Sequence, residues 1–382
     1  MSDAPAFRSE SPPTQWTAIR REFHRRAELS GHESGTAEAV AEHLTRFGAR
    51  PIVRGLGGHG VAARFDSGRD GARVLLRAEL DALPIAESRS LPHHSAQATV
   101  SHKCGHDGHL TTLLAVAERL AATPPRAGAV TVLFQPAEET GEGAARVRSD
   151  PRWEELAADV AIAWHNLPGQ APGQVILRDD VFAYGSRGLL AEFEGESAHA
   201  FEPERAVSPL PAIRRALRLL PGHTETEPVV ELTPTHVRIG EPTFGIAPGD
   251  ASLRLTLRSP SRDALDAFTE RCEAMLTELA ARSRLRLRLS RHEEFPVTRS
   301  DADVNAVIES CARSLGQETF RPPTPLRWSE DFGHLVTSRG AMFGIGAGVD
   351  HPPLHSPGYD FPDELLAPAS DLLERVVRHY TD

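Results

Sequence analysis

Residues 130–139 read Val-Thr-Val-Leu-Phe-Gln-Pro-Ala-Glu-Glu, so a short β-rich run is followed by a proline and two acids. Such a run predicts a strand buried on both faces, as in a parallel sheet. A second run of this kind spans residues 160–164 and ends at His165. Residues 110–122, which precede the first run, have apolar side chains at helical spacing. Strands that alternate with helices predict a mostly parallel sheet flanked by helices.

The same alternation extends outward over residues 1–183 and returns over residues 295–382. We assign both stretches to one discontinuous α/β domain. Its predicted helices span residues 16–28, 36–47, 110–122, 302–315 and 362–379, and its predicted strands span residues 61–65, 73–80, 130–134, 160–164 and 341–345.

The intervening residues, 184–294, follow a different order. Their pattern predicts a strand, a helix, two strands, a helix and a strand, which is the order of a ferredoxin-like module. The predicted elements span residues 189–194, 206–220, 237–240, 253–258, 261–281 and 285–290. The sequence therefore predicts an inserted α+β domain.

The composition is that of an ordinary globular protein, with 382 residues, 40% of them hydrophobic and 25% charged. The net charge of -11 argues against non-specific binding to nucleic acid or to an anionic membrane, so we expect neither as a partner. The chain has three cysteines, and its first 14 residues contain no apolar stretch typical of a signal peptide. We therefore expect a cytoplasmic protein.

The densest group of potential metal ligands is Cys104-Gly105-His106-Asp107-Gly108-His109, directly before the helix predicted at residues 110–122. Thiolate and imidazole together suit zinc and other divalent transition metals. The alternative is a buried thiol beside a polar turn.

Three further candidates follow strands or lie in rigid loops. Glu138 and Glu139 end the first strand run, where adjacent side chains on an extended segment would point to opposite sides. His165 follows the second run, and His355 lies between two prolines in Pro353-Leu354-His355-Ser356-Pro357. Taken singly, the acids fit a solvated loop and each histidine fits a structural role. Together with the Cys104 group they form a set that can bind two metal ions and leave one acid free for proton transfer.

Six motifs, in this order, resemble those of the M20-type amidohydrolases, particularly the hippurate hydrolases and the auxin-conjugate (indole-acetyl-amino-acid) hydrolases. They are Arg77-Ala78-Glu79-Leu80-Asp81-Ala82-Leu83-Pro84, the Cys104–His109 group, Phe134-Gln135-Pro136-Ala137-Glu138-Glu139, Trp164-His165, Ser197-Ala198-His199-Ala200 and the segment around His355. The resemblance extends from His24 to the last predicted helix.

The resemblance implies hydrolysis of the amide bond of a small N-acyl amino acid or related amide by a water that bridges two divalent ions. The implied metal ligands are Cys104, His106, Glu139, His165 and His355. The ions could be manganese, zinc, cobalt or nickel. Glu138 would be the general base and acid, and Asp81 would orient a ligand.

The resemblance also implies that residues 184–294 form a lid and a dimerisation surface, so we expect a homodimer. His199 would reach an active site, that of the other subunit, and stabilise the oxyanion. Without the resemblance, His199 reads as a polar residue at a turn. Glu79 and Gly245 stand where relatives have Asp and Asn, and Lys103 also departs from the common form. We interpret these departures as signs of altered substrate choice.

Two other functions fit part of the pattern. A binding protein would keep the fold without turnover, but it has no need of the unliganded acid at Glu138. A cysteine hydrolase would use Cys104 as a nucleophile beside a histidine. Activity in metal-free protein would favour the cysteine hydrolase.

Overall fold

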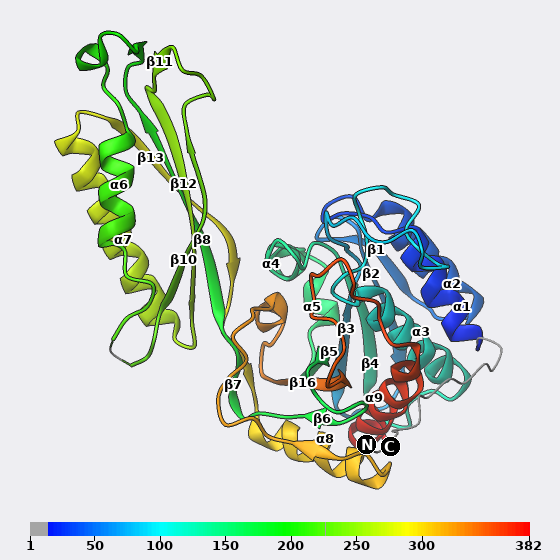
Figure 1. The fold of residues 1–382 in the computed structure, drawn as a ribbon. Helices are drawn as coiled ribbons and strands as arrows, with labels where there is room; N and C mark the ends of the chain where they lie inside the picture. The colour runs from blue at the N-terminus through cyan, green and yellow to red at the C-terminus, as the bar shows by residue number, and fades with distance from the viewer. Residues whose placement is uncertain (1–13, 226) are drawn as a thin grey trace, which may run out of the picture.

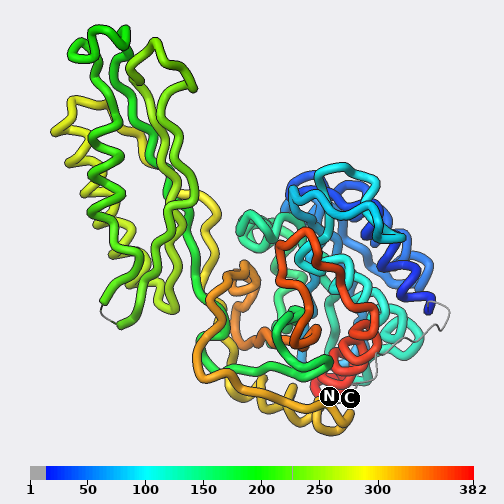
Figure 2. Tube along the Cα trace, viewed as in Figure 1, coloured from blue at the N-terminus to red at the C-terminus, as the bar shows by residue number. Residues whose placement is uncertain are grey.

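The computed structural model describes residues 14–225 and 227–382, so the expectation based on the extreme N-terminus concerns residues outside this range. Figure 1 shows two parts: a large sheet with helices on both faces, and a narrower module that extends away from it. The chain enters the module on one strand and returns on the neighbouring one, and Figure 2 shows these two crossings side by side.

The large sheet has eight strands, and its parallel centre positions the candidate site. Parallel pairing joins β4 to β3, β3 to β5 and β5 to β16, while β1, β2 and β6 pair antiparallel with their inner neighbours. The order across the sheet is β1 (Ile52–Leu56), β2 (Gly60–Asp66), β4 (Ala129–Gln135), β3 (Arg73–Glu79), β5 (Val160–Pro168), β16 (Arg339–Gly348), β6 (Val175–Ile176) and β15 (Thr319–Phe320). The mostly parallel, helix-flanked sheet predicted from the sequence is confirmed.

Helices cover the two faces unequally, and the strands feed two separate apolar cores. In β4, Val130, Val132 and Phe134 point into one core and Leu133 into the other, as the two-residue strand period requires. The first core packs against α1 (Gln15–Arg25), α2 (Ser34–Arg46), α3 (His106–Ala122), α8 (Ala302–Ser314) and α9 (Leu366–Thr381). The second packs against α4 (Gly143–Ser149) and α5 (Trp153–Leu156).

The narrower module has the predicted order of strands and helices. Its elements are β8 (Gly185–Glu194), α6 (Leu210–Leu219), β10 (Glu231–Ile239), β12 (Asp250–Ser259), α7 (Arg262–Arg282) and β13 (Arg286–Phe295). The antiparallel sheet runs β10-β12-β8-β13, and its apolar face packs against both helices. The exact domain boundaries that we assigned at residues 183/184 and 294/295 remain a prediction.

Some predicted ends differ from the structure. The helix predicted at residues 206–220 begins only at Leu210, because Val207 forms a bridge with Glu196 and Ser208 precedes a proline. The helix predicted at 16–28 ends at Arg25, whereas the one predicted at 110–122 begins earlier, at His106. Within the described residues, no helix is long and apolar enough to cross a membrane.

Candidate metal centre

The loop before α3 presents Cys104 and His106 at the carboxyl end of the large sheet. Both side chains are buried. Gly105 between them has a φ of 97°, and a Cβ at this position would lie 2.0 Å from Asn166 Oδ1. Only glycine therefore allows the loop to approach β5 this closely.

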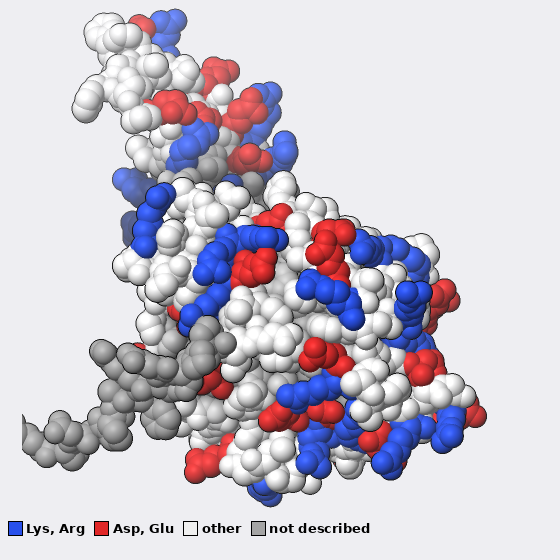
Figure 3. Space-filling model, turned by 90° about the vertical axis from the view of Figure 1, so that its right-hand side faces the viewer, with Lys and Arg blue, Asp and Glu red and all other residues white. Residues whose placement is uncertain are grey.

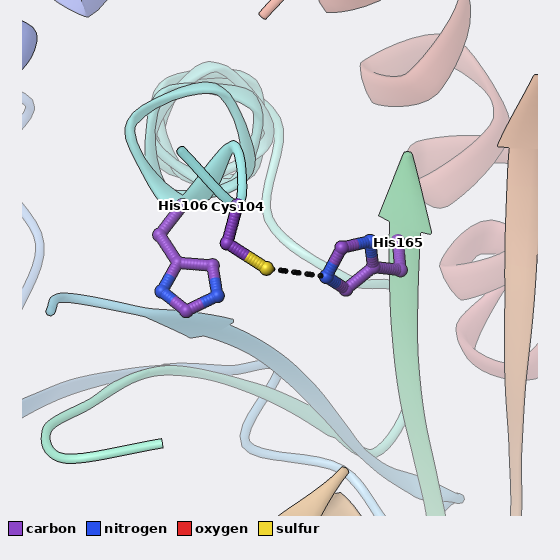
Figure 4. A group of neighbouring side chains, drawn as sticks. All are labelled: Cys104, His106 and His165. Carbon is purple, nitrogen blue, oxygen red and sulfur yellow. Dashed lines mark hydrogen bonds between the residues drawn. The ribbon is translucent and has the colours of Figure 1, made fainter. Parts of the chain in front are cut away.

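His165 extends from β5 toward the same loop. Its Nε2 lies 3.4 Å from Cys104 Sγ, and Figure 4 shows the sulfur directed at the ring. Its Nδ1 lies 2.8 Å from the carbonyl oxygen of Asn166. His106 repeats this arrangement, with Nδ1 2.8 Å from the carbonyl oxygen of Asp81. Each imidazole thus uses Nδ1 for a backbone carbonyl and presents Nε2 to the centre, which is how metal-binding histidines are usually fixed.

Glu138 and Glu139 follow β4, and both reach the centre. Oxygens of the two carboxylates each lie 3.8 Å from His106 Nε2. The expectation that they point to opposite sides is therefore wrong. The segment turns instead of staying extended, because Ala137 has a φ of 51° and Gly141 N–H donates to the Glu138 carbonyl.

His355 comes from the loop after β16 and is the least buried of the candidate ligands. Its Nε2 lies 3.6 Å from Glu139 Oε2, and its side chain is 52% exposed. Its φ is 63°, and its backbone N–H donates to the Lys103 carbonyl.

Asp81 lies behind the ligands, directly after β3. Its Oδ2 accepts hydrogen bonds from Ser30 Oγ at 2.7 Å and from the Glu139 backbone N–H at 2.9 Å. Its Oδ1 lies 3.4 Å from His106 Nδ1. Asp81 therefore connects the segments that carry His106 and Glu139.

The donor atoms form overlapping groups suited to divalent ions. Cys104, His106 and His165 form one group, and Cys104, Glu139 and His355 form another. His106 Nε2 and Glu139 Oε1 are buried without a hydrogen-bond partner, a costly state that a cation between them would relieve. The donors present therefore fit divalent metal ions.

The electrostatics of the centre also favour a bound cation. Burial, together with nearby carboxylates, raises the pKa of Glu139 to about 7 and that of Cys104 well above its usual value. Burial also raises the pKa of Glu138 well above normal, and Glu330 adds to the effect. Crowded, desolvated anions behave in this way, and added positive charge favours their ionised forms.

A buried ionic network beneath the centre was not predicted as part of the site. Arg77 Nη2 donates to Glu330 at 2.8 Å and to Asp331 at 2.7 Å, and Arg77 also pairs with Glu79. Glu79 in turn accepts from His109 Nδ1 at 2.8 Å. Glu330 and Asp331 lie close to Glu138. Glu330 also caps the short 3-10 helix η2 (Asp331–His334), because its carboxylate accepts hydrogen bonds from the N–H groups of Asp331 and Phe332.

A cavity of about 690 Å³ opens onto four of the candidate metal ligands, namely Cys104, Glu139, His165 and His355. Its walls include apolar side chains and two arginines: Leu83, Leu167, Pro168, Arg258, Phe295, Arg327, Trp328 and Leu354. Arg258 comes from β12 of the narrower module and donates to Ser329 Oγ at 2.9 Å. Trp328 packs against the ring of His165, with centroids 5.2 Å apart.

His199 is not brought to this centre by its own chain. It lies on β9 (Ala198–His199), which pairs with β11 (Ile246–Ala247) at the far end of the narrower module (Figure 1). Its side chain is exposed, and its Nδ1 accepts from the Phe201 N–H at 3.1 Å. Gly245 lies beside it, with its carbonyl accepting from Ala200 N–H.

Comparisons with known proteins place this fold and site in a family. Residues 75–379 match the profile of peptidase family M20/M25/M40. The chain is 28% identical to a hippurate hydrolase of Campylobacter jejuni, covering 96% of each chain. It is 30% identical to the IAA-amino acid hydrolase ILR1-like 2 of Arabidopsis thaliana, covering 91% of this chain and 81% of the relative.

Among solved structures, a dinuclear metal binding peptidase from the M20 family of Bacillus subtilis has the same fold. Its TM-score is 0.78 at 22% identity, with 96% of this chain and 98% of the other covered. The resemblance drawn from the six motifs is thereby confirmed, and the chain belongs to peptidase family M20/M25/M40.

Proposed function

We propose that the protein, a metal-dependent amidohydrolase of this family, cleaves the amide bond of a small N-acyl amino acid or related amide with two divalent ions. One observation carries the proposal. Five candidate donors from four separate chain segments converge beside the carboxylate of Glu138 at the edge of a cavity: Cys104, His106, Glu139, His165 and His355.

Glu138 and Asp81 have different roles in the proposed reaction. When bound, the ions would acidify a water and polarise the substrate carbonyl. Glu138 takes a proton from the attacking water as its oxygen bonds to the carbonyl carbon. As the C–N bond breaks, Glu138 passes that proton to the departing amine nitrogen. Asp81 fixes the ring of His106 and the backbone of Glu139 throughout.

The cavity suits a substrate with an apolar acyl group and a carboxylate. Leu167, Phe295 and Trp328 offer apolar surface next to the candidate ligands. Arg258 offers positive charge, whereas Arg327 is paired with Glu231. Guanidinium groups bind carboxylates in a bidentate manner. The relatives named as a hippurate hydrolase and an IAA-amino acid hydrolase support the same class.

Cys104 is a poor candidate for a nucleophile. Burial raises the pKa of its thiol well above the usual value, so the reactive thiolate is disfavoured without a cation.

The three cysteines described are all free, which supports a reducing, cytoplasmic location. We also propose that the protein works as a homodimer, because His199 lies far from the metal ligands of its own chain.

Metal-loaded and chelated protein should be compared on a panel of N-acetyl, N-benzoyl and indole-acyl amino acids. We expect metal-dependent release of a free amino acid, lost on chelation and restored by adding back manganese, zinc, cobalt or nickel. No turnover of any substrate in the loaded protein would contradict the proposal. Tight binding of unchanged ligand would instead identify a binding protein, and activity without metal would identify the thiol mechanism.

A further inference from the structure

Lys103 is the only lysine among the 382 residues, and it lies next to the candidate ligand Cys104. All other basic side chains, including those on the face in Figure 3, are therefore arginines apart from histidine. The Lys103 side chain is 1% exposed. A compact ammonium with three donors fits a small buried space that a planar guanidinium does not.

The backbone and the side chain of Lys103 contact the two ends of residues 355–359. The backbone carbonyl of Lys103 accepts a hydrogen bond from the His355 N–H at 2.8 Å. The Lys103 ammonium donates to the carbonyl of Tyr359 at 2.7 Å and pairs with Glu87. The residue thus connects the loop that carries Cys104 to both ends of residues 355–359.

His355 needs such support more than the other ligands do. Its ring is half exposed, and within the described residues it makes no side-chain hydrogen bond, only the 3.6 Å approach to Glu139. Its backbone has a left-handed φ of 63°, which is uncommon for a residue with a side chain. The position of its ring therefore depends on how its loop is held.

We propose that Lys103 is a positioning residue that holds His355 at the metal centre by fixing residues 355–359 against the Cys104 loop. This inference rests on the proposed function, because it assigns His355 to a metal ion. It makes the departure from the family at residue 103 part of the metal site.

Substituting Glu87 together with Lys103 separates an effect on the position of His355 from an effect on the stability of the fold. Burial raises the pKa of Glu87, but hydrogen bonds from His24 and Lys103 outweigh it and lower the pKa to about 2. Removing the ammonium alone would leave a buried carboxylate with one partner fewer, which destabilises a protein whatever its function. The double variant Lys103→Met/Glu87→Gln removes both charges and still leaves the Tyr359 carbonyl without its donor.

The test is a titration of metal-free protein with Co²⁺, which reports the number and affinity of bound ions without any substrate. We expect two ions in the wild type and in Glu87→Gln. In Lys103→Met/Glu87→Gln, one ion should bind normally and the other about 10- to 100-fold more weakly. Circular dichroism and thermal unfolding should show that the double variant is folded.

A double-mutant cycle with His355→Ala shows whether Lys103 affects metal affinity through His355. If Lys103 acts through His355, adding the two substitutions at Lys103 and Glu87 to His355→Ala should cause no further loss of affinity. Normal binding of both ions by the double variant, equal loss in Glu87→Gln, or fully additive losses would each overturn the inference. A wild type that binds no metal would instead overturn the proposed function.

Discussion

Glu138 and Glu139 are adjacent, yet their surroundings assign them different chemistry. Glu139 lies within reach of Cys104 and His355, and its backbone is held by Asp81. Glu138 also lies beside His106, but in addition it groups with Glu330 and Asp331, near the guanidinium of Arg77. An oxygen among anions attracts a proton, whereas one among imidazole and sulfur donors attracts a metal. These neighbours, which lie on distant segments, are the basis for the different roles that we propose for the two carboxylates.

Glu138→Gln should lower kcat by about 100- to 10,000-fold, because the amide keeps the shape but cannot move a proton. Metal content should stay at two ions, measured by elemental analysis of the dialysed protein. Glu139→Gln should lose metal first and activity as a consequence. Loss of metal in Glu138→Gln with retention in Glu139→Gln would mean that the two roles are exchanged.

Candidate ligands that carry a local signal could be named from the sequence. Cys104 and His106 stand in one short motif, and His165 follows a clear strand. The Arg77 network could not be found in this way, because Glu330 is 253 residues away and reads as a helix cap. The turn at Ala137 was missed as well, because alanine gives no local signal for a positive φ.

The positions of the candidate site residues depend on where the strands of the large sheet end. Asp81 follows β3, Glu138 follows β4 and His165 lies near the end of β5, three strands that are parallel neighbours. Parallel strands place their carboxyl ends at one edge, so the ligands meet without any motif that links them. The buried central strands were predicted well. Short strands such as β1 and β6 were not, because they are only five and two residues long.

Gly105→Ala should damage the junction between the Cys104 loop and β5. Gly316 provides a matched control, because it has a similar φ of 75° but open space where the methyl group of an alanine would lie. Gly316→Ala should lower the free energy of unfolding by about 1 to 2 kcal/mol, the cost of a left-handed alanine. Gly105→Ala should lower the free energy of unfolding by more than this, and it should also bind metal more weakly, because Asn166 must move. If urea unfolding shows equal losses of free energy for the two variants, and Gly105→Ala binds metal normally, this role for the loop is contradicted.

At the scale of the whole molecule, His199 lies on β9, which pairs with β11 at the tip of the narrower module, whereas the candidate ligands lie on the large sheet (Figure 1). The side chains around His199 include exposed apolar groups, with Phe201 and Phe244 both outside any core. If His199 is an oxyanion donor, as we propose, its place on this distant and exposed tip means that it serves a site outside its own subunit. The proposed homodimer supplies that site, because a two-fold axis would give each centre the His199 of its partner.

This arrangement predicts complementation between two inactive variants. His199→Ala should lower kcat by about 100- to 1,000-fold, the usual loss for an oxyanion donor, while both ions remain bound. A heterodimer of His199→Ala with Glu138→Gln then contains one intact site, built from Glu138 of the first variant and His199 of the second. Co-expression of both chains with different tags yields about half heterodimers, so activity should return to about a quarter of wild type. If His199 acts within its own chain, the heterodimer has no intact site and the mixture stays as inactive as its parents.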